Sequence, residues 1–185
     1  MLELKKIVEG LLFVSEVPLD AAKIHAALEG ESTPARIAEA LKALREEYAS
    51  GDRAFDVREV AGGYQFRTRP ELSLYALRLH KKSPARLSRA ALETLAVIAY
   101  RQPVLRAEIE KIRGVDAGGV LRNLLEKSLV RVSGRQDKLP GRPILYSTTA
   151  RFLETFDLPS LAALPTVEEM DKLLPPPKID ANKLF

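Results

Sequence analysis

The chain has 185 residues, 46% of them hydrophobic, which is enough for one ordinary domain or for two small ones. Its 29 Lys and Arg against 25 Asp and Glu give a net charge of +4, too small to indicate a nucleic-acid-binding protein by itself. The absence of cysteine excludes disulfides, Cys-ligated zinc and thiol chemistry, and the apolar run at residues 11–14 is too short for a signal peptide or a membrane span.

Residues 4–50 predict three helices. Apolar residues recur at helical spacing from Leu4 to Leu12, and Pro18 follows the helix that they form. A second helix is expected over residues 20–28. A third is expected to begin at Thr33-Pro34, because Thr can cap a helix and Pro suits its first turn.

A β-hairpin and a fourth helix are expected next. From residue 54 onward, hydrophobic residues alternate with polar ones on both sides of Gly62-Gly63, which predicts two strands and a turn. The run Thr68-Arg69-Pro70-Glu71 has the spacing of a capping box, so we expect a helix over residues 71–80. The polar segment after it, residues 81–84, favours a linker.

The same order then repeats in the second half. Ser88 can cap a helix that is apolar around most of its circumference, as expected of a central and buried helix. Pro103 follows this helix as Pro18 follows the first. A second helix is expected over residues 104–112 and closed by Gly114, and Asp116 is expected to cap a third.

A second hairpin completes the repeat. Residues 129–132 and 144–147 are expected to pair around a turn at Pro140-Gly141. Aligning the two prolines superimposes Leu19 on Val104, which indicates an internal duplication. Three helices followed by a hairpin are the element order of a winged helix, so the predicted fold is mainly α with small β-hairpins (α+β), as two tandem winged-helix domains.

Four segments follow from this reading. Residues 1–82 form the first winged-helix domain, residues 83–87 a linker and residues 88–165 the second winged-helix domain. Residues 166–185 follow Pro165 and contain Pro175-Pro176-Pro177 and scattered charges. This composition cannot form a core and predicts a flexible Pro-rich tail.

Distinctive sequence blocks occur in both halves, in collinear order over about residues 2–165. They are Glu9 to Ser15 with Pro18-Leu19, Gly62 to Phe66, Thr68 to Glu71, Leu92 to Pro103, Ile112 to Val115 and Gly141 to Thr149. These blocks resemble the signature blocks of the ScpB family of bacterial chromosome-segregation proteins. Two places differ from the family pattern: Asp157 stands where Gly is expected after the last helix, and the segment 136–140 is slightly longer than usual.

The resemblance implies a non-catalytic subunit of the SMC-ScpA-ScpB condensin complex, which supports chromosome condensation and segregation. It implies a cytoplasmic protein associated with the nucleoid and without membrane attachment. It also implies a homodimer formed through residues 1–82, with the kleisin ScpA as direct partner and SMC reached through ScpA. We expect residues 88–165 to bind that partner.

No catalytic, cofactor-binding or metal-binding residues are expected, because no phosphate loop, nucleophile elbow or cluster of metal ligands occurs. The expected partner-binding residues lie on the first helix and the wing of the second domain: Tyr100, Arg101, Gln102, Gly141, Arg142, Pro143 and Tyr146. Candidates for a weak contact with DNA are Arg131, Arg135, Lys138 and Arg142. Candidates for the dimer interface are Leu2, Leu4 and Phe13.

The alternative is a DNA-binding winged-helix transcriptional regulator, because many such domains read bases with the first residues of their third helix. Here that turn is Asp116-Ala117-Gly118-Gly119, in which Asp is repelled by phosphate and Gly has no side chain to offer. The four basic residues of the second wing predict at most weak, salt-sensitive binding. They fit an ordinary solvated loop equally well.

Overall fold

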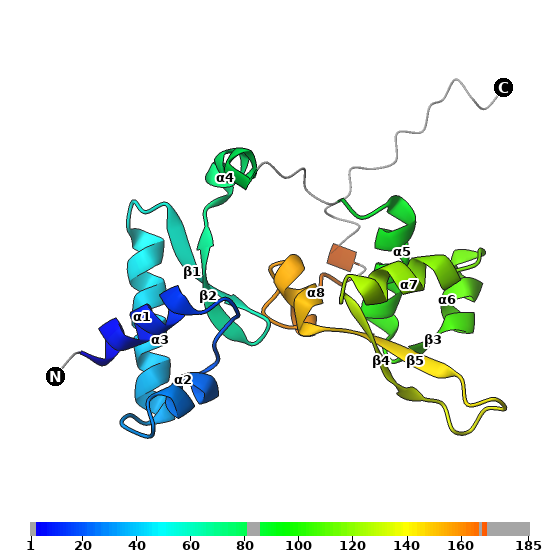
Figure 1. Cartoon of the computed structure of the whole chain (residues 1–185), viewed down its shortest axis with the longest axis horizontal. Coiled ribbons are helices and arrows are strands. Elements are labelled where there is room, and N and C mark those ends of the chain that lie inside the picture. The colour runs from blue at the N-terminus through cyan, green and yellow to red at the C-terminus, as the bar shows by residue number, and fades with distance from the viewer. Residues whose placement is uncertain (1–2, 81–85, 167, 170–185) are drawn as a thin grey trace.

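The computed structural model describes residues 3–80, 86–166 and 168–169. Figure 1 shows two lobes, in each of which helices pack against a hairpin. The first lobe contains α1 (Leu4–Val14), α2 (Ala21–Ala27), α3 (Pro34–Ser50), β1 (Phe55–Val60) and β2 (Gly63–Thr68). After it come the 3-10 turn η1 (Pro70–Leu72) and α4 (Ser73–His80).

The second lobe repeats this order with one added strand. It contains α5 (Arg89–Arg101), β3 (Val104–Leu105), α6 (Arg106–Arg113), α7 (Gly118–Glu126), β4 (Val130–Arg135), β5 (Ile144–Thr148), α8 (Ala150–Thr155) and the 3-10 turn η2 (Leu161–Ala163). The first sheet is the antiparallel pair β1-β2, and the second has the order β3-β5-β4. The predicted fold class, two tandem winged-helix domains with small hairpins, is therefore confirmed.

Several predicted helix ends are confirmed. The hydroxyl oxygen of Thr33 accepts a hydrogen bond from the Arg36 N–H at 3.4 Å, and that of Ser88 accepts from the Ala91 N–H at 3.2 Å. Gly114 closes α6 with a φ of 71°, in the left-handed region that favours glycine.

Three local predictions were wrong. Residues 104–105 form a strand that pairs with Leu145 and Tyr146, so the helix begins only at Arg106. The capping box at residues 68–71 does not form, because η1 begins after Arg69 without a side-chain cap. Residue 117 rather than Asp116 flanks α7, although the Asp116 carboxylate accepts a hydrogen bond from the Gly118 N–H at 3.1 Å.

Two separate hydrophobic cores hold the lobes together. The first is Val8, Leu12, Ile24, Leu28, Ile37, Ala40, Leu41, Leu44, Tyr48 and Val57. The second is Ala91, Leu95, Ile98, Ala99, Val104, Ile109, Ala117, Leu121, Leu124, Leu129, Val130 and Phe152. Neither core draws on the other half of the chain, which supports the proposed division into residues 1–82 and 88–165. The core of the proposed linker, residues 83–85, and most of the proposed tail lie outside the described residues.

The same backbone tie fastens the helices to the hairpin in both lobes. Leu19 and Tyr64 exchange two hydrogen bonds, of 3.0 Å from the Leu19 N–H and 2.8 Å from the Tyr64 N–H. In the second lobe Val104 is likewise the antiparallel partner of Tyr146. Because the sequence alignment superimposes Leu19 on Val104, this shared tie supports the internal duplication.

We expect Gly63→Ala to destabilise the first lobe. A Cβ at Gly63 would lie 2.8 Å from the Leu19 carbonyl carbon, and the paired backbone cannot move away without breaking the tie. The expected loss is about 1–3 kcal/mol of unfolding free energy, measured by urea denaturation. Gly10→Ala is the control, because no atom lies within 4 Å of its Cβ position in the exposed middle of α1. We expect that change to stabilise the chain by about 0.5–1 kcal/mol. Equal midpoints for both variants would contradict the role of the tie.

Candidate protein-binding site

An apolar hollow of about 340 Å³ lies beside α5 and α8 in the second lobe. Along α5, Leu95 and Ala99 face the core, whereas Leu92, Ala96 and Tyr100 recur every four residues on a neighbouring face. That second face lines the hollow. The complete lining is Leu92, Leu95, Ala96, Ala99, Tyr100, Phe152, Phe156, Leu158, Leu164 and Pro165.

The hollow remains open to solvent in the isolated chain. Leu92 is 46% exposed and Phe156 is 40% exposed, although both are large apolar side chains. Phe156 packs against the buried Phe152, with 5.0 Å between the ring centroids and an angle of 45° between the ring planes. At the rim of the hollow the Tyr100 hydroxyl donates a hydrogen bond of 2.6 Å to the Pro165 carbonyl. This bond holds the segment Leu164-Pro165 against α5. An apolar side chain of a partner would complete this packing.

The prediction that α5 is central and buried holds for one side of the helix, where Leu95 and Ile98 lie in the core. The core covers only part of the circumference, and the Leu92 face is only partly covered by the described residues. The lining residues that come from α8 and from the segment after it were not among the predicted site residues. They are Phe152, Phe156, Leu158, Leu164 and Pro165. Exposed aromatic and aliphatic residues late in the domain, such as Phe156 and Leu164, were the available signal, but sequence spacing could not place them opposite α5.

The other predicted partner residues lie apart from Tyr100. The Gln102 side-chain oxygen accepts hydrogen bonds from the Thr148 N–H at 2.7 Å and from the Thr148 hydroxyl at 3.0 Å. Gln102 therefore ties the end of α5 to β5 and has a structural role. Arg101 is exposed beside it.

A second, wider hollow of about 750 Å³ lies between α6 and the wing. Its lining is Leu105, Arg106, Ala107, Glu110, Arg135, Leu139, Pro140, Pro143, Ile144 and Tyr146. Pro143 and Tyr146 were predicted partner residues. Gly141 and Arg142 form the exposed tip of the wing, with φ values of 76° and 43°. The predicted partner residues thus divide between two hollows instead of forming one patch.

The basic residues of the second wing are partly engaged within the wing itself. The Arg142 guanidinium lies 2.5 Å from the Asp137 carboxylate, and Arg135 donates a hydrogen bond of 3.1 Å to the Arg142 carbonyl. Arg131 and Lys138 are exposed. This leaves little concentrated positive charge for a phosphate backbone.

The first turn of α7, the helix that would read DNA, is closed by carboxylates of its own chain. The Glu110 carboxylate accepts a hydrogen bond of 3.0 Å from the Ala117 N–H and one of 2.6 Å from Arg106. These two contacts, the Ala117 N–H first, hold the pKa of Glu110 below its ordinary value. The Arg106 guanidinium also pairs with Asp116 and covers Gly118, where a Cβ would lie 3.0 Å from it. Two N–H groups that could bind a phosphate are therefore already engaged.

The dimer-interface candidates have different surroundings. Leu2 lies outside the described residues, and Leu4 packs in part against the first core. Phe13 is 76% exposed at the end of α1. Only Phe13 of the three is shown to offer a free apolar surface.

Metal-binding clusters and membrane-spanning helices are both absent from the described part of the chain. Among those residues, no group of three or more His, Cys, Asp or Glu side chains is placed to hold a metal ion. None of the described helices combines the length and the apolar character needed to cross a bilayer.

Comparison with known proteins gives a consistent set of relatives. The family model of the segregation and condensation complex subunit ScpB matches residues 6–167. Segregation and condensation protein B of Syntrophotalea carbinolica is 52% identical over 171 residues, which cover 92% of this chain and 85% of that protein. The protein of the same name from Myxococcus xanthus is 46% identical over 170 residues, covering 92% of this chain and 51% of that longer protein. The crystal structure of ScpB from Mycobacterium tuberculosis is 36% identical, with a TM-score of 0.39, and the match covers 83% of this chain and 94% of that one.

We expect Glu110→Gln to lower the melting temperature at neutral pH. We also expect the melting temperature of this variant to fall less steeply with decreasing pH than that of the unaltered chain. Since folding lowers the pKa of Glu110, its contribution is present above the unfolded pKa of about 4.3 and is lost as the pH falls through the folded pKa. Thermal melts between about pH 7 and pH 3 measure both effects. Glu126→Gln, an exposed carboxylate at the other end of α7, is the control. An unchanged acid slope in the Glu110 variant would contradict this account.

Proposed function

The chain belongs to the ScpB family of segregation and condensation complex subunits, and we propose that its part in the SMC complex is to bind the kleisin ScpA as a homodimer. Members of this family are non-catalytic subunits of the complex that segregates and condenses chromosomes. In this proposal SMC is reached through ScpA, chromosomal DNA is contacted weakly or indirectly, and the protein works in the cytoplasm at the nucleoid.

The observation that carries the proposal is the open apolar hollow beside α5. A folded domain gains nothing from leaving Leu92 and Phe156 in water, whereas a partner that buries them gains free energy in proportion to the apolar area covered. The spacing of Leu92, Ala96 and Tyr100 along one helix face suits an amphipathic helix or an extended apolar segment of the kleisin. Partner binding is accordingly proposed for residues 88–165.

The alternative, a sequence-reading transcriptional regulator, has less support. Its reading helix would begin at Ala117-Gly118, whose N–H groups are hydrogen-bonded to Glu110 and Asp116. Ala117 is completely buried and Gly118 has no side chain, so neither can contact a base edge. The basic wing remains compatible with a weak, salt-sensitive contact with DNA.

We expect Leu92→Asp to weaken the binding of the ScpA central segment at least about tenfold, because a carboxylate in the hollow would be buried without a partner. Isothermal titration calorimetry with the purified segment measures the affinity. Ile112→Asp is the matched control, since Ile112 is 54% exposed on α6, away from the hollow. Circular dichroism checks that both variants are folded. Equal affinities for the two variants would exclude the hollow, and no binding by the unaltered chain at micromolar concentrations would refute the proposal of a kleisin partner.

The first domain, residues 1–82, is proposed to form the dimer, with α4 as a large part of the interface. Three of its large apolar side chains are strongly exposed: Leu74 by 62%, Tyr75 by 66% and Leu79 by 79%. Figure 1 shows α4 standing away from α1, α2 and α3. A helix of eight residues is too short to be stable in water without packing. A second copy of the chain would supply that packing. The exposed Phe13 on α1 is a further apolar side chain that the second copy could bury.

We expect the double variant Leu74→Glu with Leu79→Glu to be monomeric at micromolar concentrations where the unaltered chain is dimeric, because glutamates facing each other across a two-fold interface repel. Light scattering coupled to size-exclusion chromatography gives the mass. Leu139→Glu, a 44% exposed leucine on the second wing, should leave the dimer intact. A dimeric double variant would remove α4 from the interface, and a monomeric unaltered chain would refute the proposed dimer.

A further inference from the structure

The wing of the first lobe is in contact with the second lobe through its backbone. At the turn between β1 and β2, the Ala61 N–H donates a hydrogen bond of 2.9 Å to the Leu158 carbonyl, and the Gly62 N–H donates one of 2.8 Å to the Pro159 carbonyl. In Figure 1 this turn lies against the segment that follows α8. The tip that would touch a ligand in a free winged helix is therefore occupied by the chain itself.

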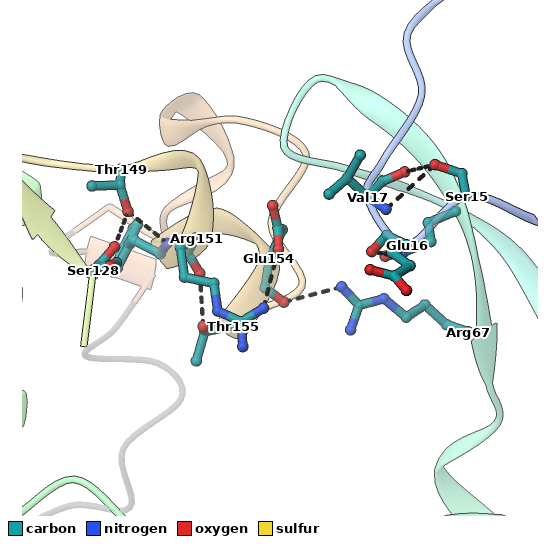
Figure 2. A network of polar contacts seen from close by, with 11 residues as sticks. Ser15, Glu16, Val17, Arg67, Ser128, Thr149, Arg151, Glu154 and Thr155 are labelled. Carbon is teal, nitrogen blue, oxygen red and sulfur yellow. Dashed lines mark hydrogen bonds and ion pairs between the residues drawn. The ribbon is translucent and has the colours of Figure 1, made fainter. Parts of the chain in front are cut away.

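Two arginines of the same hairpin extend the contact. The Arg58 guanidinium lies 2.9 Å from the Asp157 carboxylate, and Arg67 donates a hydrogen bond of 3.3 Å to the Glu154 carbonyl. Figure 2 shows Arg67 reaching across from β2 to the carbonyl at the end of α8. Four polar contacts thus join β1, β2 and their turn to residues 154–159.

Val60 adds an apolar element to this contact. Its side chain is completely buried, yet it belongs to neither hydrophobic core. The next two residues are the ones that bond to Leu158 and Pro159. Because side chains alternate along a strand, Val60 lies on the same face of β1 as Arg58, which pairs with Asp157, so the second lobe is placed to cover it.

Asp157 has an unusual conformation for its residue type. Its φ of 55° is left-handed, and the Leu158 N–H donates to the Leu153 carbonyl at 2.9 Å. Together these form a common helix ending in which glycine usually holds the left-handed position. Glycine would adopt this conformation with less strain. An aspartate here has a strained backbone but brings a carboxylate to Arg58.

We propose that the first wing is an internal clamp that fixes the orientation of the two winged-helix domains, and that Asp157 is its latch. The clamp is formed by Arg58, Val60, Ala61, Gly62 and Arg67 on one side and by residues 154–159 on the other. It sets the direction in which the α5 hollow faces relative to α4. The inference depends on neither the kleisin nor the dimer proposal, because every contact that carries it lies within one chain.

The test is the distance between the two domains in the full chain. Because the sequence has no cysteine, Ala38→Cys and Arg122→Cys introduce one spin label on the exposed side of α3 and one on that of α7. The labelled chain is mixed with a large excess of unlabelled chain, so that a dimer carries at most one labelled copy. Pulsed electron paramagnetic resonance then gives the distribution of distances within that copy. We expect a single narrow distribution for the labelled chain with its clamp intact. A broad distribution at this stage would overturn the proposal.

Two further substitutions test whether the Arg58–Asp157 ion pair holds the two domains together. Asp157→Gly keeps the left-handed ending of α8 and removes only the carboxylate, so the ratio of docked to undocked molecules should fall roughly two- to fivefold. Arg58→Glu would face both Asp157 and Asp56, and the ratio should fall at least about tenfold. Arg89→Ala is the matched control, because it breaks an ion pair of the same 2.9 Å length within α5.

The melting temperature distinguishes a latch from a merely structural residue. Asp157→Gly should leave the melting temperature of the second domain unchanged or raised, since it relieves the strained φ, while the distance distribution broadens. If Asp157→Gly and Arg58→Glu both leave the distribution as narrow as Arg89→Ala does, the clamp is refuted.

Discussion

The limited size of each core is the constraint on which the rest of the structure depends. A winged-helix domain of this length has too little interior to cover every apolar face of its helices. The second core buries Leu95 and Ile98 but leaves the Leu92 face of the same helix exposed, and the first core leaves α4 uncovered. These uncovered faces are what a subunit of an assembly needs, because docking surfaces must stay apolar without being part of the folding core.

The same scaffold serves DNA readers elsewhere, and the difference here lies in how its polar groups are engaged. At the start of α7 the backbone N–H groups bond to Glu110 and Asp116, and the nearby Arg106 is neutralised by both carboxylates. The first wing bonds to the second lobe. The elements that would approach a duplex are therefore turned to internal contacts, while the apolar faces are left for protein. This distribution fits a subunit that positions other proteins.

Sequence patterns predicted most of the fold, because helical periodicity and capping residues are local. The helices capped by Thr33 and Ser88 and the glycine ending at Gly114 were all recognised. The strand at residues 104–105 was missed because two residues are too few to show a period of two, and its partner Tyr146 is distant in sequence. The protein-binding site beside α5 was less predictable from sequence than the fold. Tyr100 was identified as a surface residue, but its partners in the hollow, Phe156 and Leu164, come from a segment whose placement depends on tertiary packing. Asp157 was noticed only as a departure from a pattern, and its pairing with Arg58 spans 99 positions of the chain.

The burial of Val60 has a consequence for synthesis on the ribosome. Residues 154–159 leave the exit tunnel almost a hundred positions after Val60, so the wing beside that valine is made long before its hydrogen-bond and ion-pair partners in the second lobe. At ordinary elongation rates the wait is on the order of 5–20 s. During that time the nascent domain carries an exposed strand end beside a valine, which is the kind of surface that chaperones shield and that neighbouring nascent chains can capture. Timing of translation, and not only final contacts, therefore bears on how efficiently this chain reaches its native state.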